Sequence, residues 1–188
     1  MREIEVKAVL ADAEEAERRL VDAGAELEFR GALEDRRYDT GDGDLAERGE
    51  VLRIRTYRSP GSVVASLDWK GPSGTEQGYK VREEIATPVT DPAALAEMLK
   101  RLGYEVVREV DRQIIQYRVA GAMVRIEIYP RMETLVEVEG EPAAIESAIE
   151  LLGMSRGEFS SDALAAFVTR FERRTGVKSA ISYGETRG

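Results

Sequence analysis

The sequence predicts an α+β fold, in which eight or nine antiparallel strands form a barrel or a strongly curved sheet with helices packed outside. Short segments rich in β-branched residues follow one another, and most are separated by turn signals such as Ser59-Pro60-Gly61-Ser62. Four other segments have helix caps and helical periodicity. Strands that are joined mostly as hairpins are typical of closed barrels and curved sheets.

The four predicted helices each end at a glycine. Asp12 and Asp91 stand where an N-cap side chain accepts a backbone N–H, and Pro92 takes the first helical position of the second helix. The helices are expected at about residues 13–23, 92–102, 142–152 and 163–175, before Gly24, Gly103, Gly153 and Gly176.

The strands are expected at about residues 2–10, 33–39, 50–58, 63–70, 78–87, 104–110, 112–119, 122–129 and 134–139. Asp39, Asp42 and Asp44 lie in a glycine-rich stretch without the EF-hand spacing, so we predict a turn there. Little pattern follows Gly176. We therefore expect one domain over residues 1–176 and a frayed C-terminal tail over residues 177–188.

The composition excludes many kinds of active site. The chain has 188 residues with 27 Lys and Arg, 36 Asp and Glu, no His and no Cys, and a net charge of −9. A Ser-His-Asp triad, a thiolate nucleophile, a zinc site with His or Cys ligands and a disulfide framework are all ruled out. A bound metal would need oxygen ligands, which favours Mg²⁺, Mn²⁺ or Ca²⁺.

The same composition sets expectations about location and partners. No apolar run approaches the length of a transmembrane span, and Met1-Arg2-Glu3-Ile4-Glu5 does not begin a signal peptide, so we expect a cytoplasmic protein. An acidic surface repels nucleic acid and anionic membranes, so we expect neither as a partner. A homodimer is the general expectation for a soluble enzyme.

Charged residues of both signs occupy alternate positions in five predicted strands. Side chains of a strand point to opposite faces with a period of two, so each set shares one face of its strand, and mostly apolar residues take the other. The sets are Glu3, Glu5 and Lys7; Arg53 and Arg55; Lys80, Arg82 and Glu84; Arg125 and Glu127; and Glu137 and Glu139.

Two arrangements satisfy this alternation. The charged faces form either the solvated outside of a sheet, with weak cross-strand ion pairs, or the lumen of a barrel. The charges are sorted, with carboxylates towards both ends of the chain and basic residues in the middle. A solvated sheet does not need such sorting. A lumen that binds a divalent metal and a polyphosphate does, so we favour the second arrangement.

Several motifs occur in a fixed order along residues 2–174. They are Glu3-x-Glu5-x-Lys7, Asp35-Arg36-Arg37-Tyr38-Asp39, Leu52-Arg53-Ile54-Arg55, Trp69-Lys70-Gly71, Lys80-Val81-Arg82-Glu83-Glu84, the pair Arg108 and Arg112, and Val136-Glu137-Val138-Glu139-Gly140. This ordered set resembles the CYTH superfamily, the triphosphate tunnel metalloenzymes, whose first motif is ExExK. Class IV adenylyl cyclases, thiamine triphosphatases and inorganic triphosphatases belong to that family.

The resemblance implies an eight-stranded antiparallel barrel that forms a triphosphate tunnel. It implies Mg²⁺ or Mn²⁺ as cofactor, with carboxylate ligands from Glu3, Glu5, Glu127, Glu137 and Glu139. It implies triphosphate binding by Lys7, Arg53, Arg55, Lys70, Lys80, Arg82, Arg112 and Arg125. The catalytic residues would be Glu3, Glu5, Lys7 and Glu137.

The expected reaction is metal-dependent hydrolysis of a small-molecule triphosphate, either inorganic or carrying a nucleoside or thiamine. The first alternative is a class IV adenylyl cyclase that makes cyclic AMP. Bacterial class IV cyclases often have a His-Phe pair before ExExK, and only Met1 and Arg2 precede it here, so we favour hydrolysis. The second alternative is a polyphosphate- or nucleotide-binding module, which would not need five carboxylates.

Overall fold

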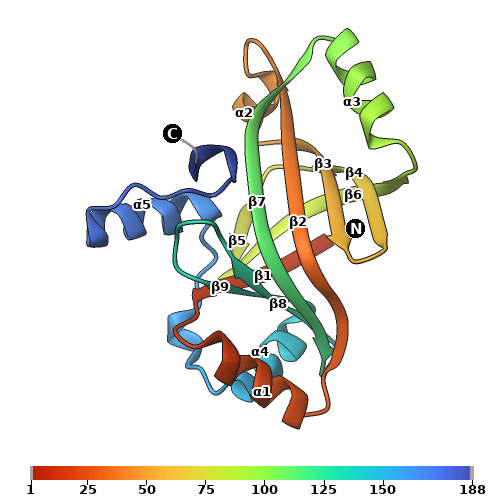
Figure 1. Ribbon diagram of the computed structural model, residues 1–188. Helices are drawn as coiled ribbons and strands as arrows, with labels where there is room; N and C mark the ends of the chain where they lie inside the picture. Colours follow the sequence, from red (N-terminus) through yellow and green to blue (C-terminus); the bar gives the residue numbers. More distant parts are fainter. Residues whose placement is uncertain (1, 187–188) are drawn as a thin grey trace.

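The computed structural model describes residues 2–186, and its centre is a closed antiparallel barrel (Figure 1). Eight strands follow one another around the barrel in the order β1-β9-β8-β7-β2-β3-β4-β6, and pairing of β6 with β1 closes it. A ninth, three-residue strand, β5, pairs with β6. The strands are β1 (Arg2–Val9), β2 (Glu26–Thr40), β3 (Val51–Ser59), β4 (Ser62–Lys70), β5 (Gly74–Glu76), β6 (Tyr79–Val89), β7 (Tyr104–Val119), β8 (Ala122–Ile128) and β9 (Leu135–Glu139).

Strands β2 and β7 are the longest, with 15 and 16 residues, and they pair along their whole length (Figure 1). The strand predicted at residues 33–39 is therefore too short, and the two strands predicted on either side of Asp111 are one. Asp111 does not interrupt β7, because its buried carboxylate accepts hydrogen bonds from Arg36, at 2.6 Å, and from the backbone N–H of Tyr183, at 2.9 Å. A charge that is paired in this way is tolerated inside a strand.

The four predicted helices are confirmed. They are α1 (Ala13–Asp22), α3 (Pro92–Arg101), α4 (Pro142–Leu152) and α5 (Leu164–Thr175), and Asp12 and Asp91 cap the first two by accepting the N–H of Glu15 and of Ala94, each at 2.9 Å. Two 3₁₀ turns follow at Arg156–Glu158 and Gly184–Thr186. None of the helices within residues 2–186 is long and apolar enough to cross a membrane.

A short helix, α2 (Asp44–Glu47), stands where the sequence predicted only a turn. The side chain of Asp39 accepts hydrogen bonds from the backbone N–H groups of Thr40, Leu45 and Ala46, at 2.8, 2.9 and 2.9 Å. These bonds satisfy donors that a helix start leaves without an intrahelical partner. Asp39 therefore works as a structural cap rather than as a cation ligand.

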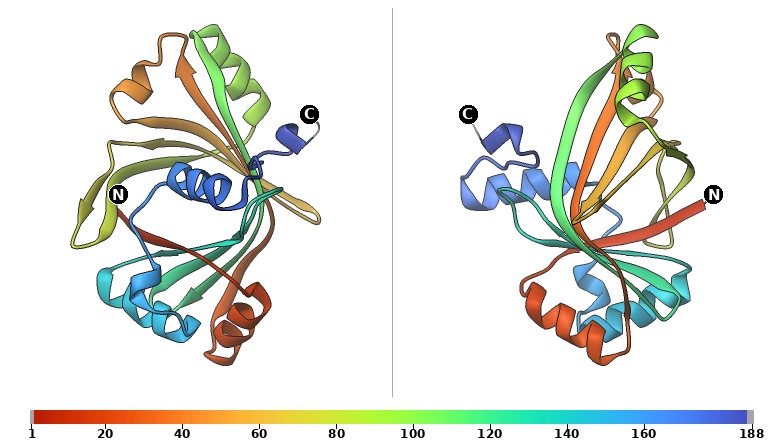
Figure 2. Two further views of the ribbon diagram at one scale, coloured as in Figure 1. Left: turned by 90° about the vertical axis from the view of Figure 1, so that its left-hand side faces the viewer. Right: turned by 45° about the vertical axis from the view of Figure 1, so that its right-hand side comes forward.

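The helices cover the apolar outer face of the barrel (Figure 2). Leu20 of α1 and Ile149 of α4 belong to the largest buried cluster, together with Val6 and Val136 of the strands beneath them. Leu99 of α3 joins a second cluster, above β2 and β3. Where a helix covers a strand, the apolar residues of that strand point to the helix, and the alternate residues point into the barrel.

The sequence predicted a frayed tail over residues 177–188, and this prediction is wrong for residues 177–186; residues 187 and 188 lie outside the described residues. Ala180, Ile181 and Ser182 are buried, and Ile181 belongs to a cluster with Phe167 of α5 and Leu135 of β9. Ala180 exchanges two backbone hydrogen bonds of 2.9 and 3.0 Å with Arg131, and the carbonyl of Ile181 accepts the N–H of Asp111 at 2.7 Å. Single apolar residues give no periodic pattern, which is why the sequence did not reveal this packing.

Replacement of Ile181 by alanine tests the packing of this segment. Because Ile181 is 5 % exposed, Ile181→Ala should lower the free energy of unfolding by about 2–4 kcal/mol in urea titrations. Val177, which is 47 % exposed, provides the control, and Val177→Ala should change that free energy by less than about 0.5 kcal/mol. Equal, small effects of the two substitutions would mean that the segment is not part of the packed fold.

Candidate active site

The charged residues of β1 lie inside the barrel. Glu3, Glu5 and Lys7 are 7, 6 and 7 % exposed, and the apolar residues between them, Ile4 and Val6, are also buried. A strand on the solvated outside of a sheet would expose one of its faces. The lumen arrangement is therefore confirmed for β1.

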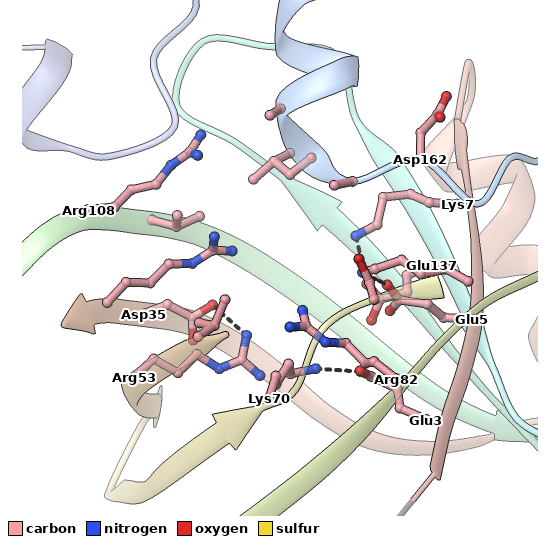
Figure 3. A pocket seen from close by; sticks show the side chains of 18 of the residues that line it. Glu3, Glu5, Lys7, Asp35, Arg53, Lys70, Arg82, Arg108, Glu137 and Asp162 are labelled. Carbon is pink, nitrogen blue, oxygen red and sulfur yellow. Dashed lines mark hydrogen bonds and ion pairs between the residues drawn. The ribbon is translucent and has the colours of Figure 1, made fainter. Parts of the chain in front are cut away.

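A cavity of about 350 Å³ occupies the lumen, which is within the range of small-molecule binding sites (Figure 3). Ten basic and seven acidic side chains line it among the described residues, although the chain as a whole has a net charge of −9. Residues 162–165, at the start of α5, border the same cavity. Basic side chains thus outnumber acidic ones around the cavity, whereas acidic residues outnumber basic ones in the chain as a whole.

One side of the cavity, which we call the carboxylate wall, consists of Glu3 and Glu5 of β1 and Glu137 of β9. Lysines neutralise it: Lys7 lies 2.6 Å from Glu137, and Lys70 lies 2.5 Å from Glu3. Lys80 forms an ion pair with Glu5. Figure 3 shows that Glu3, Glu5, Lys7, Lys70 and Glu137 come together from different strands.

Lys7 bridges the carboxylate wall to β8. Its ammonium lies 2.8 Å from Glu127, whose other oxygen accepts a hydrogen bond from Arg112 at 2.8 Å. Burial would raise the pKa of Glu127, but Lys7 and Arg112 lower it to about 2. Burial would likewise lower the pKa of Lys7, but Glu127 and Glu137 raise it above its ordinary value. Both groups are therefore charged at neutral pH.

The opposite side of the barrel, which we call the arginine wall, consists of Arg37 of β2, Arg53 and Arg55 of β3, and Arg108 of β7. Asp35 lies within it, and its carboxylate accepts a hydrogen bond from Arg55 at 2.8 Å and lies 3.6 Å from Arg53. Burial would raise the pKa of Asp35, but Arg53 and Arg55 hold it well below its usual range. Strand order places β1 and β2 four positions apart in a ring of eight, so the two walls face each other.

Comparison with protein-family models identifies the family of this chain. The CYTH domain model matches residues 1–154. The chain belongs to the CYTH domain family. No curated protein sequence matches it.

Solved structures resemble this CYTH domain over most of its length. A proposed adenylate cyclase from Vibrio parahaemolyticus has a TM-score of 0.75 and 18 % identity, and the match covers 89 % of this chain and 97 % of that one. The PH1819 protein from Pyrococcus horikoshii has a TM-score of 0.70 and 25 % identity, and the match covers 89 % of this chain and 98 % of that one. HpAC1 from Hippeastrum is described as a proposed adenylyl cyclase with a dominant triphosphatase activity. It has a TM-score of 0.61 and 18 % identity, and the match covers 93 % of this chain and 95 % of that one.

Most of the residues predicted for the site of this CYTH domain line the cavity. They are Glu3, Glu5, Lys7, Arg53, Arg55, Lys70, Lys80, Arg82, Arg112, Arg125, Glu127 and Glu137. Glu139 is not among the lining residues, although it pairs with Glu5 in the sheet and shares a strand face with Glu137. The structure brings the other twelve together around one cavity.

Five charged residues that line the cavity were not among the predicted site residues: Asp35, Arg37, Glu50, Arg108 and Asp162. Asp68, which was not predicted either, is 2 % exposed and accepts a hydrogen bond from Arg53 at 2.9 Å. For two of these residues the sequence contains a pattern that could have predicted their position. Asp35 and Arg37 have the spacing of two residues that places both on one face of β2, as in the other charged sets.

The carboxylates of this CYTH domain fit a hard divalent cation. One oxygen of Glu3 is buried without a hydrogen-bond donor, and burial together with Glu137 raises the pKa of Glu5. A divalent cation would supply the charge that these oxygens lack, so Glu3, Glu5 and Glu137 are the residues that would hold it. Residues 2–186 contain no ready-made group of three acidic residues that could hold a metal ion. The lysines described above neutralise these carboxylates instead.

Glu139 makes the stability of the ligand-free protein depend on pH. Burial, with repulsion by Glu137, raises its pKa from 4.5 to about 7. Since the folded state holds this proton more tightly than the unfolded state, the free energy of unfolding should fall as the pH rises between these two values. Glu139→Gln should flatten this fall and stabilise the ligand-free protein at about pH 8, as measured by urea titrations across the range.

Glu150, which is exposed on α4, provides the matched control, because Glu150→Gln removes the same charge outside the barrel. Its pH profile should follow that of the wild type. A Glu139→Gln profile that also follows the wild type would contradict the assignment.

Proposed function

We propose that this CYTH domain is a divalent-cation-dependent triphosphatase, which hydrolyses a phosphoanhydride bond of a triphosphate in the barrel cavity. One observation carries the proposal: a closed lumen in a strongly acidic chain is lined by ten basic side chains among the described residues. So many buried cations are unfavourable without anions, and a triphosphate supplies a compact row of negative charges. The triphosphatase activity of HpAC1 supports the proposal.

In the proposed mechanism, Lys70, Lys80 and Arg82 beside the carboxylate wall, and Arg53 and Arg55 of the arginine wall, bind the phosphate oxygens. Phosphoryl transfer depends mainly on such positioning and charge neutralisation. A divalent cation, when bound, supplies further neutralisation of phosphate oxygens. Glu3 and Glu137 are its proposed ligands, together with Glu5.

Glu5 is also the proposed proton acceptor. In the ligand-free protein, burial and repulsion by Glu137 raise the pKa of Glu5, whereas the pKa of Glu137 is held well below its usual range because Lys7 and Arg125 oppose the effect of burial. Glu5 is therefore the more basic of these two carboxylates. Water attacks the phosphorus at the carboxylate wall and gives its proton to Glu5. The bond from that phosphorus to the bridging oxygen breaks, so that orthophosphate forms. The remaining diphosphate, which is pyrophosphate from tripolyphosphate or the organic diphosphate from ATP or thiamine triphosphate, leaves towards the arginine wall.

The lining of the cavity favours hydrolysis over cyclisation. Tyr129 is the only aromatic side chain among the described residues that line it, and its hydroxyl donates a hydrogen bond to Glu127 at 2.9 Å. An adenine ring bound inside the lumen would therefore find charged groups and little stacking surface. The seven acidic side chains that line the cavity among the described residues in turn favour an enzyme over a module that only binds polyphosphate.

Released products distinguish the alternatives. Purified protein with Mg²⁺ or Mn²⁺ should release phosphate from tripolyphosphate, ATP or thiamine triphosphate, and EDTA should abolish the release. Cyclic AMP without phosphate release would instead identify a cyclase. Binding of tripolyphosphate, seen as a raised melting temperature, without any product would identify a binding module.

Glu137→Gln tests the carboxylate wall. It should lower kcat by about 100-fold or more, because it removes a proposed cation ligand and the anion that Lys7 faces. Glu97→Gln, on the exposed face of α3, provides the control and should keep wild-type kcat. The melting temperature of both variants should be measured as well. Lys7→Arg, which keeps the positive charge beside Glu127 and Glu137, serves to separate an effect on catalysis from an effect on folding. Full activity of Glu137→Gln would rule out this site.

A further inference from the structure

A second cavity lies where the end of β1 meets the first 3₁₀ turn and α5. Its volume is about 360 Å³, close to the 350 Å³ of the lumen cavity, and the two share no lining residue among those that the structure describes. The proposed reaction does not use it. Its lining combines apolar side chains with one cation and one carboxylate: Val9, Phe159, Phe167, Gly157, Ser160, Arg170 and Glu158.

The charges of this lining indicate which ligands fit it. The guanidinium of Arg170 lies over the ring of Phe167, 4.4 Å from the ring centroid, beside the other apolar side chains. An organic ion with an apolar body and an anionic group matches both, because the body covers the apolar side chains and the guanidinium donates to the anion. Glu158, whose carboxylate accepts the backbone N–H of Ser155 at 2.7 Å, adds a negative charge to the lining. A monoanion therefore fits better than a multiply charged phosphate.

One side-chain ion pair joins the second cavity to the first. Arg170 donates a hydrogen bond of 2.6 Å to the carboxylate of Asp162, which borders the lumen cavity. The hydroxyl of Ser160 donates to the same carboxylate oxygen at 3.1 Å. The hydrogen bond from Arg170 lowers the pKa of Asp162, so this carboxylate is charged at neutral pH and Arg170 neutralises it.

A backbone contact forms a second connection. Ser160, in the lining of the second cavity, exchanges two backbone hydrogen bonds of 2.9 Å with Lys7, the lysine that contacts Glu127 and Glu137. In Figure 3, Asp162 lies just above Lys7 at the border of the lumen. A ligand that contacts Arg170 and Ser160 therefore lies within one residue of two groups of the candidate active site.

We propose that the second cavity is an effector site for a small organic monoanion with an apolar body, and that its occupation weakens triphosphate binding in the lumen. The anion accepts the hydrogen bonds that Arg170 otherwise donates to Asp162. The negative charge of Asp162 then stands without its cation at the border of the lumen, where it repels an anionic substrate. The site itself rests on the geometry of the second cavity, and its effect on triphosphate binding rests on the proposed function.

Binding of naphthalenesulfonate, an aromatic monoanion, tests the site. Isothermal titration calorimetry in EDTA would give its Kd for the wild type and for Val9→Glu, which adds a carboxylate to the second cavity and should weaken binding by about tenfold or more. Val21→Glu makes the same change at an exposed position of α1 and should change the Kd by less than about twofold. Should Val9→Glu fail to fold, Arg170→Gln carries the same comparison.

The linkage between two ligands tests the effect on the lumen. Saturating tripolyphosphate should raise the Kd of naphthalenesulfonate by about fivefold or more, up to a plateau, because coupling between separate sites is finite and reciprocal. Asp162→Asn should still bind naphthalenesulfonate and should remove this rise, since no charge is then uncovered. A Kd that rises without a plateau would mean that both anions compete for the lumen, and the effector site would be wrong.

The remaining outcomes separate this inference from the proposed function. If the wild type does not bind naphthalenesulfonate, or if Val9→Glu and Arg170→Gln bind it as tightly as the wild type, the effector site is wrong and the triphosphatase stands. If bound tripolyphosphate leaves the Kd unchanged, the proposed effect on the lumen is wrong. If the wild type binds no triphosphate, the proposed function falls, and the comparison of Val9→Glu with Val21→Glu alone decides whether the second cavity is a binding site.

Discussion

Burial of charge inside a closed barrel is the constraint on which the rest of this structure depends. A charged side chain can leave water only if it is paired, and here most pairs join strands that are far apart in the sequence. Lys7 contacts Glu137, 130 residues away, and Lys70 contacts Glu3, 67 residues away. Such ion pairs add little stability over an apolar lumen, because desolvation offsets their attraction. They do favour one arrangement of strands, since a shifted register would leave charges unpaired or place them against the helices.

The lumen is polarised by the same pairing. Carboxylates gather on β1 and β9, and arginines gather on β2, β3 and β7, on opposite sides of the ring. Where the two sets meet, at Lys7, Arg112 and Glu127, the charges neutralise one another. At the two extremes, single polar atoms remain unsatisfied: one oxygen of Glu3 lacks a hydrogen-bond donor, and the Nε of Arg37 lacks an acceptor. A ligand with a cation at one end and anionic groups along its length would satisfy both, and a metal complex of a triphosphate has that form.

Period-two alternation is a local property, so the sequence was sufficient to predict which side chains of β1, β3 and β9 share a face. It was also sufficient for the four main helices, because Asp12 and Asp91 cap helices through contacts three residues away. The missed features depend on contacts between distant segments. Asp111 continues β7 only because Arg36 and the backbone of Tyr183 neutralise it, and Ile181 is buried only because α5 and β9 lie beside it. No pattern within a short window encodes such partners.

The place of β1 in the ring has a consequence for the synthesis of the chain. β1 pairs with β6 on one side and with β9 on the other, and the partner of Glu5 in β9 is Glu139. β1 therefore keeps an unpaired edge until β9, which begins at Leu135, has been made. Contacts of such long sequence separation slow folding, and an unpaired edge invites association with other chains. The alternating charges of β1 lie along this unpaired edge, where they disfavour pairing with the apolar strands of neighbouring nascent chains.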